Sequence, residues 1–247
     1  MKTLIKGLIK LLLISIFIVT VSCSEDKKAN VVIQGEIQNY CQKEITLQEI
    51  FTPTLDIIHV SKSDKNGNFK IEIFDNIDNS FYKLKFDDTN SIFLYLENNQ
   101  NITIQSTYPD IPQNYSLTNS KDSELLSRLH KRLLQSLDSI NDLRQLAINT
   151  FYIEDFNIDS LNNEISKKAS SIFKHTQNYV SNFIYDNYKS PIIYVALFQY
   201  LDAEPIFNFK MNRDIFNFVF ENIKTYNPNL KQLNYLEKII LTNNTAL

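Results

Sequence analysis

The sequence predicts an α+β fold, in which an antiparallel β-sandwich or open barrel of seven to eight strands is followed by a helical region of about five helices. Three observations support this expectation. From Val31 to Thr118, apolar and polar residues alternate with a period of two, as side chains do along half-buried strands. After Asn119 the apolar residues recur with the 3.6-residue period of a helix. The links between the strand-like runs are short, polar and free of helical segments, which favours antiparallel pairing.

The first half contains seven strand-like runs and an eighth, weaker one. Phe69, Ile71 and Ile73 illustrate the pattern, because they alternate with charged residues. Directly before them, Asn66-Gly67 is the strongest hairpin signal in the chain, since both residues tolerate a positive φ angle. The expected strands span residues 31–38, 44–50, 55–62, 67–74, 80–87, 91–97, 101–106 and 114–118.

The second half is expected to hold five helices, spanning about 121–148, 160–188, 191–201, 212–225 and 228–241. Asn119, Ser120 and Asp122 stand at the start of the first, where their side-chain oxygens can accept hydrogen bonds from backbone N–H groups. Later, Ser190-Pro191 places a capping serine before a proline at the first helical position. One stripe of large aliphatic side chains predicts that the first helix docks on its neighbours: Leu125, Leu129, Leu133, Leu137, Ile140 and Leu143.

The first 22 residues are expected to be a signal peptide. Lys2, Lys6 and Lys10 give a basic start, and an uncharged, mostly apolar run from Leu11 to Val21 follows. Such a run rises only about 16 Å as a helix, against about 30 Å of bilayer hydrocarbon, so it is short for a membrane span. An uncleaved membrane anchor or a buried helix is the alternative.

The residues that follow indicate a lipid anchor. Thr20-Val21-Ser22-Cys23 resembles the lipobox of bacterial lipoproteins, with Thr20 in place of the usual leucine, and predicts lipidation (palmitate) of Cys23. The acidic residues after Cys23 resemble the surface-export signal of Bacteroidota-type lipoproteins, although a plain solvated linker would look similar. The expected organisation is a signal peptide over 1–22, a tether over 23–30, a β domain over 31–118 and an α-helical domain over 119–247.

Charge and composition exclude several functions. Cleavage before Cys23 would leave 225 residues with 22 Lys and Arg against 28 Asp and Glu, a net charge of −6, which is unsuited to binding nucleic acid. The three glycines cannot form a glycine-rich nucleotide-binding loop. With Cys23 lipidated, Cys41 is the single remaining thiol, so the protein is expected to be redox-inert by itself. Cys41 is expected to be a small, half-buried residue.

Several short motifs occur in the order seen in one known family: Ile33-x-Gly35-x-Ile37, Asp64-x-x-Gly67-x-Phe69, Leu94-x-Leu96, Ile102-x-Ile104, Tyr115 to Ser120, and Ser190-Pro191. Over residues 31–225 the chain resembles the N-terminal domain of unknown function of Bacteroidota thiol:disulfide interchange (AhpC/TSA, thioredoxin-like) lipoproteins. In that family a thioredoxin-like domain with a Cys-x-x-Cys motif follows. No such motif occurs here, so the residues that would carry the family's redox activity are missing.

The remaining candidate residues suggest no catalytic or metal site. His59, His130 and His175 are not spaced as local metal ligands and are expected to be satisfied at the edge of the core. Asp64-x-Asn66-x-Asn68 begins like a calcium loop but lacks its later ligands, and is interpreted as a hairpin tip. Asp87-Asp88 is interpreted as a turn. We therefore expect no catalytic residue, no metal and no cofactor.

Aromatic residues crowd together between Tyr179 and Tyr226. Core packing is the favoured interpretation, and a stacking platform for sugars or a partner is the alternative. Phe216, Phe218 and Phe220 point around a helix rather than along one stripe, which predicts that at least one is partly exposed.

The sequence thus predicts a non-catalytic outer-membrane lipoprotein that faces the periplasm or the cell surface and binds a ligand or an envelope protein. The alternative is the accessory half of a thiol:disulfide system that acts with a separate thioredoxin-like protein.

Overall fold

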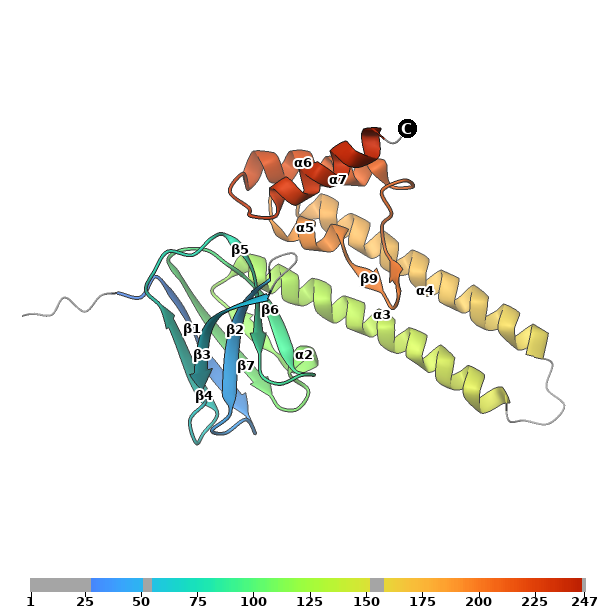
Figure 1. Ribbon diagram of the computed structural model, residues 1–247. Coiled ribbons are helices and arrows are strands. Elements are labelled where there is room, and N and C mark those ends of the chain that lie inside the picture. The colour runs from blue at the N-terminus through green and yellow to red at the C-terminus, as the bar shows by residue number, and fades with distance from the viewer. Residues whose placement is uncertain (1–27, 51–54, 152–157, 246–247) are drawn as a thin grey trace, which may run out of the picture.

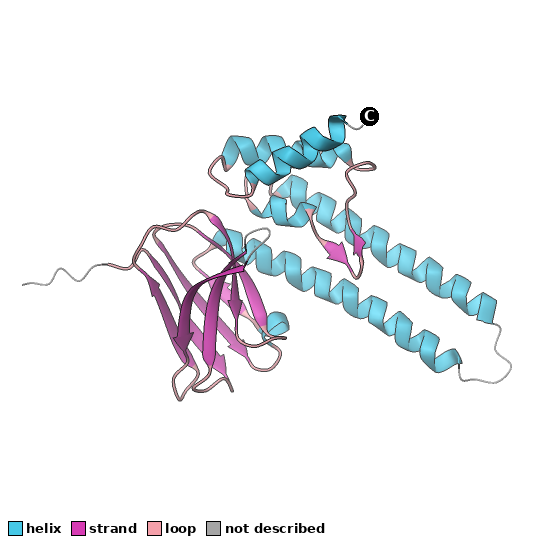
Figure 2. Cartoon of the chain, viewed as in Figure 1, coloured by secondary structure: helices cyan, strands magenta, loops and turns pink. Residues whose placement is uncertain are grey.

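The computed structural model describes residues 28–50, 55–151 and 158–245 of the 247-residue chain. It has the expected α+β architecture: strands form a sandwich in the first half, and helices follow (Figures 1 and 2). Within these residues no helix is both long and apolar enough to cross a membrane. Cys23 and the expected signal peptide lie outside the described residues.

Two four-stranded sheets face each other in the sandwich and do not close into a barrel. The order β4-β1-β7-β8 forms sheet A, from β1 (Val31–Gln38), β4 (Asn68–Ile73), β7 (Gln100–Thr107) and β8 (Ser116–Thr118). The order β3-β2-β5-β6 forms sheet B, from β2 (Glu44–Ile50), β3 (Leu55–Lys62), β5 (Ser80–Lys85) and β6 (Ser91–Leu96). Among the described strands, β1 and β7 pair in parallel and every other pairing is antiparallel.

The inner faces of the two sheets form the sandwich core, as the period-two pattern predicts. Ile33 and Ile71 of sheet A and Leu84 and Leu94 of sheet B are fully buried in this core. Gly35 lies on β1 opposite Ile104 of β7, where a Cβ atom would come within 1.8 Å of the Ile104 carbonyl oxygen. The parallel pair therefore requires glycine at this position.

Sheet B is buried on its outer face as well, along β5 and β6. Phe81 and Tyr95 belong to the helical core, whereas their neighbours Tyr82 and Leu94 belong to the sandwich core. Helix α3 (Lys121–Phe151) packs against β6. The two halves of the chain thus share an apolar junction.

The helical region consists of α3, α4 (Ile158–Asp186), α5 (Ile192–Leu197), α6 (Arg213–Tyr226) and α7 (Leu233–Thr245). Helix α3 runs away from the sandwich and α4 returns beside it, while the shorter helices lie together over the sandwich end of this pair (Figure 1). Where α3 and α4 pack, Thr176 donates a hydrogen bond of 2.9 Å to the Ser136 hydroxyl.

Polar contacts hold the junction together. Ser123, in the first turn of α3, accepts a hydrogen bond from the Tyr95 backbone N–H and donates one to its carbonyl, both at 3.0 Å. The Lys231 ammonium lies 2.9 Å from Glu49 on β2 and 3.1 Å from Asp78. These contacts fix both ends of the helical region to sheet B.

Some expected elements are corrected by the structure. The helix expected over 191–201 ends at Leu197, because a two-stranded hairpin of β9 (Tyr200–Leu201) and β10 (Glu204–Pro205) follows. The last helix begins at Leu233 rather than Pro228, since Asn227 to Leu230 form a hydrogen-bonded turn. A short helix, α2 (Ile111–Asn114), precedes β8 where no helix was expected.

Candidate functional site

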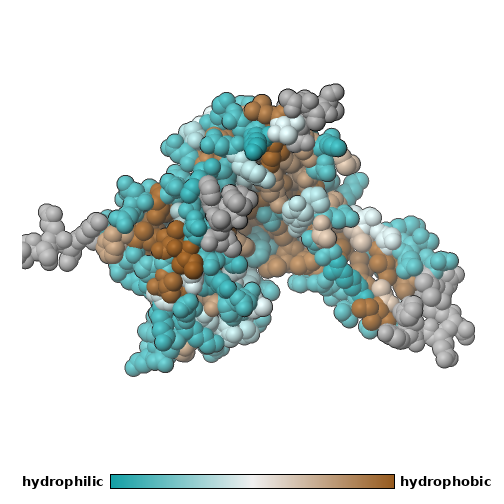
Figure 3. Space-filling view, in the orientation of Figure 1, coloured by the Kyte–Doolittle hydropathy of each residue, from teal (hydrophilic) through white to brown (hydrophobic). Residues whose placement is uncertain are grey.

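A cavity of about 310 Å³ lies where the outer face of sheet B meets the helices, and we call it the junction cavity. It is mostly apolar, and it takes residues from β2, β5, β6, α3, α5, the turn after α5 and the segment before α7. Its lining residues are Ile50, Phe81, Phe93, Leu126, Leu129, His130, Tyr194, Val195, Phe198, Gln199 and Gln232. Figure 3 shows hydrophobic surface in the middle of the visible face, between the sandwich and the helical region.

Aromatic rings line the junction cavity from both halves of the chain. The rings of Phe81 and Tyr194 are nearly parallel, with centroids 6.1 Å apart. Tyr194 also contacts Phe198 at 5.0 Å, and Phe93 contacts the His130 ring edge-to-face at 5.8 Å. Such contacts hold the rings in fixed orientations, so the cavity has defined flat walls.

Gln232 supplies a fixed polar group. Its Nε2 donates to the Ser80 hydroxyl at 3.0 Å and to the Ile50 carbonyl at 3.4 Å. Because a carbonyl oxygen can only accept, this contact assigns the amide nitrogen to that side. Gln232 is only 6% exposed, and its Oε1 is a buried acceptor without a hydrogen-bond partner among the described residues.

His130 contributes a second unpaired atom. Its Nδ1 is buried and has no hydrogen-bond partner among the described residues. Burial, with a smaller effect of the neighbouring Lys131 charge, lowers the pKa of His130 below its ordinary value of 6.5. The imidazole is therefore neutral at pH 7, and a neutral imidazole offers one acceptor nitrogen.

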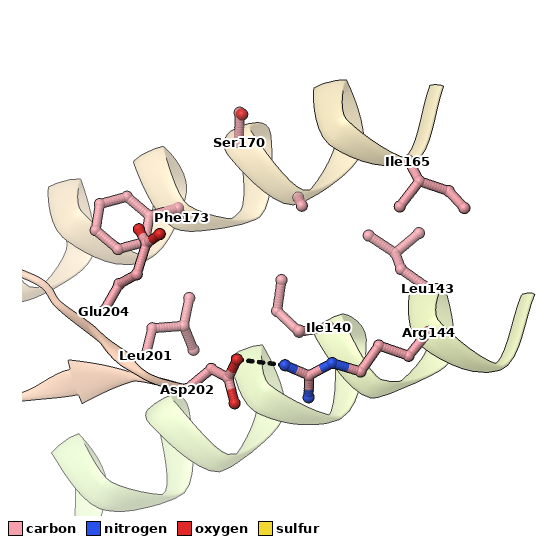
Figure 4. A pocket seen from close by; sticks show the side chains of 10 residues that line it. Ile140, Leu143, Arg144, Ile165, Ser170, Phe173, Leu201, Asp202 and Glu204 are labelled. Carbon is pink, nitrogen blue, oxygen red and sulfur yellow. Dashed lines mark hydrogen bonds and ion pairs between the residues drawn. The ribbon is translucent and has the colours of Figure 1, made fainter. Parts of the chain in front are cut away.

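A second cavity, of about 450 Å³, lies between α3, α4 and the β9–β10 hairpin. Figure 4 shows Leu143 of α3 facing Ile165 of α4 across it, and the ion pair of Arg144 with Asp202 at its edge. Both partners of this ion pair are nearly half exposed. We call this hollow the interhelical cavity. Although it is larger, its polar groups are solvated, so the junction cavity has the more distinctive chemistry.

The structure places the predicted candidate residues apart. His59 lies on β3, His130 on α3 and His175 on α4, where it is exposed. No group of three or more His, Cys, Asp or Glu side chains among the described residues could hold a metal ion. The expectation of satisfied histidines is wrong for Nδ1 of His130. Cys41 is exposed rather than half-buried, because it lies in the turn after β1.

Two acidic motifs form turns, as predicted. Asp64 accepts hydrogen bonds from the backbone N–H groups of Asn66 at 2.7 Å and Asn68 at 2.9 Å, at the tip of a hairpin. Burial raises the pKa of the Asp87 carboxyl, but hydrogen bonds from Thr89 and Asn90 outweigh this effect and lower the pKa to about 2. Both carboxylates thus stabilise loops.

The sequence did not predict the residues of the junction cavity, although one pattern indicated that a strand of the sandwich is buried on both faces. The run Ile92 to Leu96 is apolar throughout, which is typical of a strand buried on both faces. This run could have shown that Phe93 faces a second layer. Nothing in the sequence marks Gln232, since its role depends on β2 and β5, which are distant along the chain.

No protein-family model and no curated protein matches this chain. A crystal structure of (S)-allantoin synthase is similar over 38% of this chain and 45% of its own, with 9% sequence identity and a TM-score of 0.28. This chain thus spans less than half of that protein. A likeness of this size has no bearing on fold or function.

Proposed function

We propose that the protein is a non-catalytic, lipid-anchored binding protein of the bacterial cell envelope, which binds a small molecule in the junction cavity. Cys23 attaches it to the outer membrane. The single observation that carries the proposal is the junction cavity itself, a space of about 310 Å³ lined mainly by apolar and aromatic side chains.

Free energy supports a binding role for this cavity. The apolar side chains that line a cavity gain free energy, about 25 cal/mol per Å², when a ligand removes their surface from water. Ligand cavities typically combine apolar walls with a few polar groups and begin at roughly 300 Å³. The junction cavity has both properties.

The surroundings of the cavity are arranged to hold it open. Ser123 and Lys231 connect the helices to sheet B on either side, through the hydrogen bonds and ion pairs described above. Their contacts keep the two halves at a fixed separation while large rings fill the space only in part. A protein with a preformed cavity of this kind loses little conformational entropy when a ligand binds.

Native mass spectrometry of the lipoprotein, extracted from its own cells in mild detergent, tests this proposal. We expect a non-covalently bound small molecule on the wild-type protein. Val195→Phe adds a ring inside the junction cavity and should abolish the added mass. Ala169→Leu adds similar bulk in the interhelical cavity and should leave the added mass unchanged. A wild-type protein without added mass, or a ligand that Val195→Phe retains, would contradict the proposal.

A further inference from the structure

We propose that the anchored protein lies with one edge of its sandwich on the lipid bilayer, through an exposed apolar surface that we call the edge patch. The edge patch consists of Ile57, Ile58 and Val60 on β3 and of Phe74 directly after β4. This inference rests on the lipid anchor of the proposed function and names the surface that meets the membrane. Three observations lead to it: the exposure of the patch, its place beside the start of β1, and a lysine next to it.

The side chains of the edge patch are large, apolar and exposed. Their exposed fractions are 62% for Ile57, 38% for Ile58, 51% for Val60 and 44% for Phe74. Figure 3 shows hydrophobic surface over this part of the sandwich, on the side where β1 begins. Apolar side chains that gather on a surface in this way mark contact with a partner or a membrane.

Strand pairing places the β3 side chains on one face. Val60 lies opposite Thr46 of β2, and Ile57 lies opposite Gln48. The residue between these two partners, Leu47, is buried in the sandwich core, so Thr46 and Gln48 point to the outer face of sheet B. Because cross-strand partners share a face, Ile57 and Val60 point outward as well. A β-bulge between them adds one residue to β3 and keeps both on this face.

Phe74 joins this surface at the edge of the sandwich. Strands β3 and β4 leave the same hairpin, and the Ser61 hydroxyl donates a hydrogen bond of 3.1 Å to the Lys70 carbonyl. Ile57 lies four residues from Ser61, and Phe74 lies four residues from Lys70, both away from the hairpin tip. The two side chains thus lie at the same end of the edge that these strands form.

The edge patch lies where the chain enters the fold. The Asn30 backbone N–H donates a hydrogen bond of 2.8 Å to the carbonyl of Ile73, the residue before Phe74. Cys23 precedes Lys28, the first described residue, by five residues, which span at most about 18 Å. An acylated Cys23 at the membrane surface therefore keeps this end of the sandwich within reach of the bilayer.

A bilayer is the occupant that this arrangement favours. Because the anchor holds the patch beside the membrane, its contact with lipid is effectively intramolecular. Lys83 of β5 lies opposite Gln48 and continues the row that contains Ile57. Its methylene groups can lie along the apolar surface while its ammonium reaches lipid phosphates. Helices α3 and α4 extend away from the side of the sandwich where β1 begins (Figure 1).

Quenching by spin-labelled lipids tests this contact. The mature lipoprotein is reconstituted in vesicles of phosphatidylethanolamine and phosphatidylglycerol that contain a doxyl-labelled lipid. A fluorophore is attached at Ile57→Cys or Val60→Cys, each combined with Cys41→Ser. The control carries it on native Cys41, which is exposed after the far end of β1, a strand that spans about 26 Å. We expect at least about threefold stronger quenching at both patch positions than at Cys41, since apolar side chains enter the membrane interface.

Matched variants assign the quenching to the edge patch. With the fluorophore at Val60→Cys, the double replacement Ile57→Asp and Phe74→Asp should lower the quenching to the level of Cys41, because a carboxylate is costly to remove from water. Met211→Asp, before α6, changes another apolar side chain that is 84% exposed and should leave the quenching unchanged. Thermal melting checks that each variant is folded.

Flotation with the vesicles keeps the anchor separate from the docking. A lipoprotein that floats but is quenched equally at Val60→Cys and Cys41 would overturn the inference and leave the anchor standing. A fluorophore shielded from aqueous iodide yet unquenched by lipid would indicate a second copy of the chain on the patch and overturn the inference. Quenching that persists in the double Asp variant would overturn it too. A wild-type lipoprotein that does not float would overturn both the anchor and the inference.

Discussion

Three buried side-chain atoms lack a hydrogen-bond partner among the described residues: Gln232 Oε1 and His130 Nδ1, on residues that line the junction cavity, and Tyr115 Oη in the sandwich core. Most buried polar side chains of this protein are paired. Ser63, for example, donates to the Tyr40 carbonyl at 2.5 Å, and Thr176 donates to Ser136. The unpaired atoms are exceptions to this pairing, and each lowers the free energy of unfolding by roughly 1–3 kcal/mol.

The lowered pKa of His130 predicts a pH dependence of stability. The unfolded chain protonates the His130 imidazole near pH 6.5, whereas the folded chain protonates it only at lower pH. The free energy of unfolding is therefore highest above pH 6.5, where the imidazole is neutral in both states. It decreases as the pH falls from 6.5 through the pKa of His130 in the folded state.

Urea unfolding at pH 7.5 and pH 5.5 measures this effect. The wild-type protein should lose more free energy of unfolding between these pH values than His130→Phe does. The same replacement at His175, which is exposed on α4, serves as the control and should keep the wild-type difference. A His130→Phe variant with the wild-type pH dependence would show that burial of His130 has no such consequence.

Lipidation is the residue-scale prediction that depends on the sequence alone. The basic start, the apolar run and Ser22-Cys23 predict that Cys23 carries the acyl chains. Cells grown with a labelled fatty acid should label the wild-type protein and leave Cys23→Ser unlabelled. Cys41→Ser should keep the label, because Cys41 lies in a turn of the folded protein. Equal labelling of wild type and Cys23→Ser would rule out this anchor.

At the scale of elements, α3 shows how the environment changes along one helix. Leu125, Leu129 and Leu133 are buried, whereas Leu137 and Leu143 on the same stripe are only partly buried. The first three lie near sheet B and the short helices, while the outer part of α3 packs beside α4. The 3.6-residue period predicted the helix and its apolar face, but it could not predict which layer would cover each turn.

The buried end of this stripe yields a paired prediction. Leu133→Asp places an unpaired carboxylate in a side-chain site that is 7% exposed, and should reduce the free energy of unfolding by at least about 3 kcal/mol. Arg128→Asp, on the exposed side of α3, should change it by less than about 1 kcal/mol. Thermal and urea unfolding compare the two. Similar losses in both variants would mean that the face of α3 is wrongly assigned.

Other elements show what local sequence signals can and cannot predict. The strands over 31–38 and 44–50 and the start of the helix at Lys121 were predictable, because alternation and capping residues are local. Ser120 accepts the hydrogen bond from the Ser123 backbone N–H at 3.3 Å, as a capping residue does. The β9–β10 hairpin was not predictable, since its turn uses Asp202 at a positive φ of 57° instead of glycine.

At the scale of the whole molecule, the sandwich and the helices share a packed junction. Phe81 and Tyr95 of sheet B belong to the helical core, and Lys231 returns from the end of the chain to Glu49. The sandwich strands precede the helical region, as expected. Their contact surface was not predictable, because it joins segments up to 182 residues apart.

This arrangement explains why a cavity lies at the junction. Each half has a continuous core of its own, with large rings at the boundary. Rings from a twisted sheet and from crossing helices do not fill a boundary completely, and the remaining space is the junction cavity. Its lining residues come from sheet B, from α3 and α5 and from the segment before α7, so the cavity exists only in the complete fold.

The central claim is that the junction cavity, and not the larger interhelical cavity, is the binding site. Methyl-labelled protein, titrated with 2-naphthol and followed by NMR, tests it directly, because a bound ring shifts the resonances of nearby methyl groups. Leu129 and Val195 report on the junction cavity, and Leu143 and Leu201 report on the interhelical cavity. We expect saturable shifts of Leu129 and Val195 with Leu143 and Leu201 unchanged. Shifts confined to Leu143 and Leu201, or no shift at any of the four, would contradict the claim.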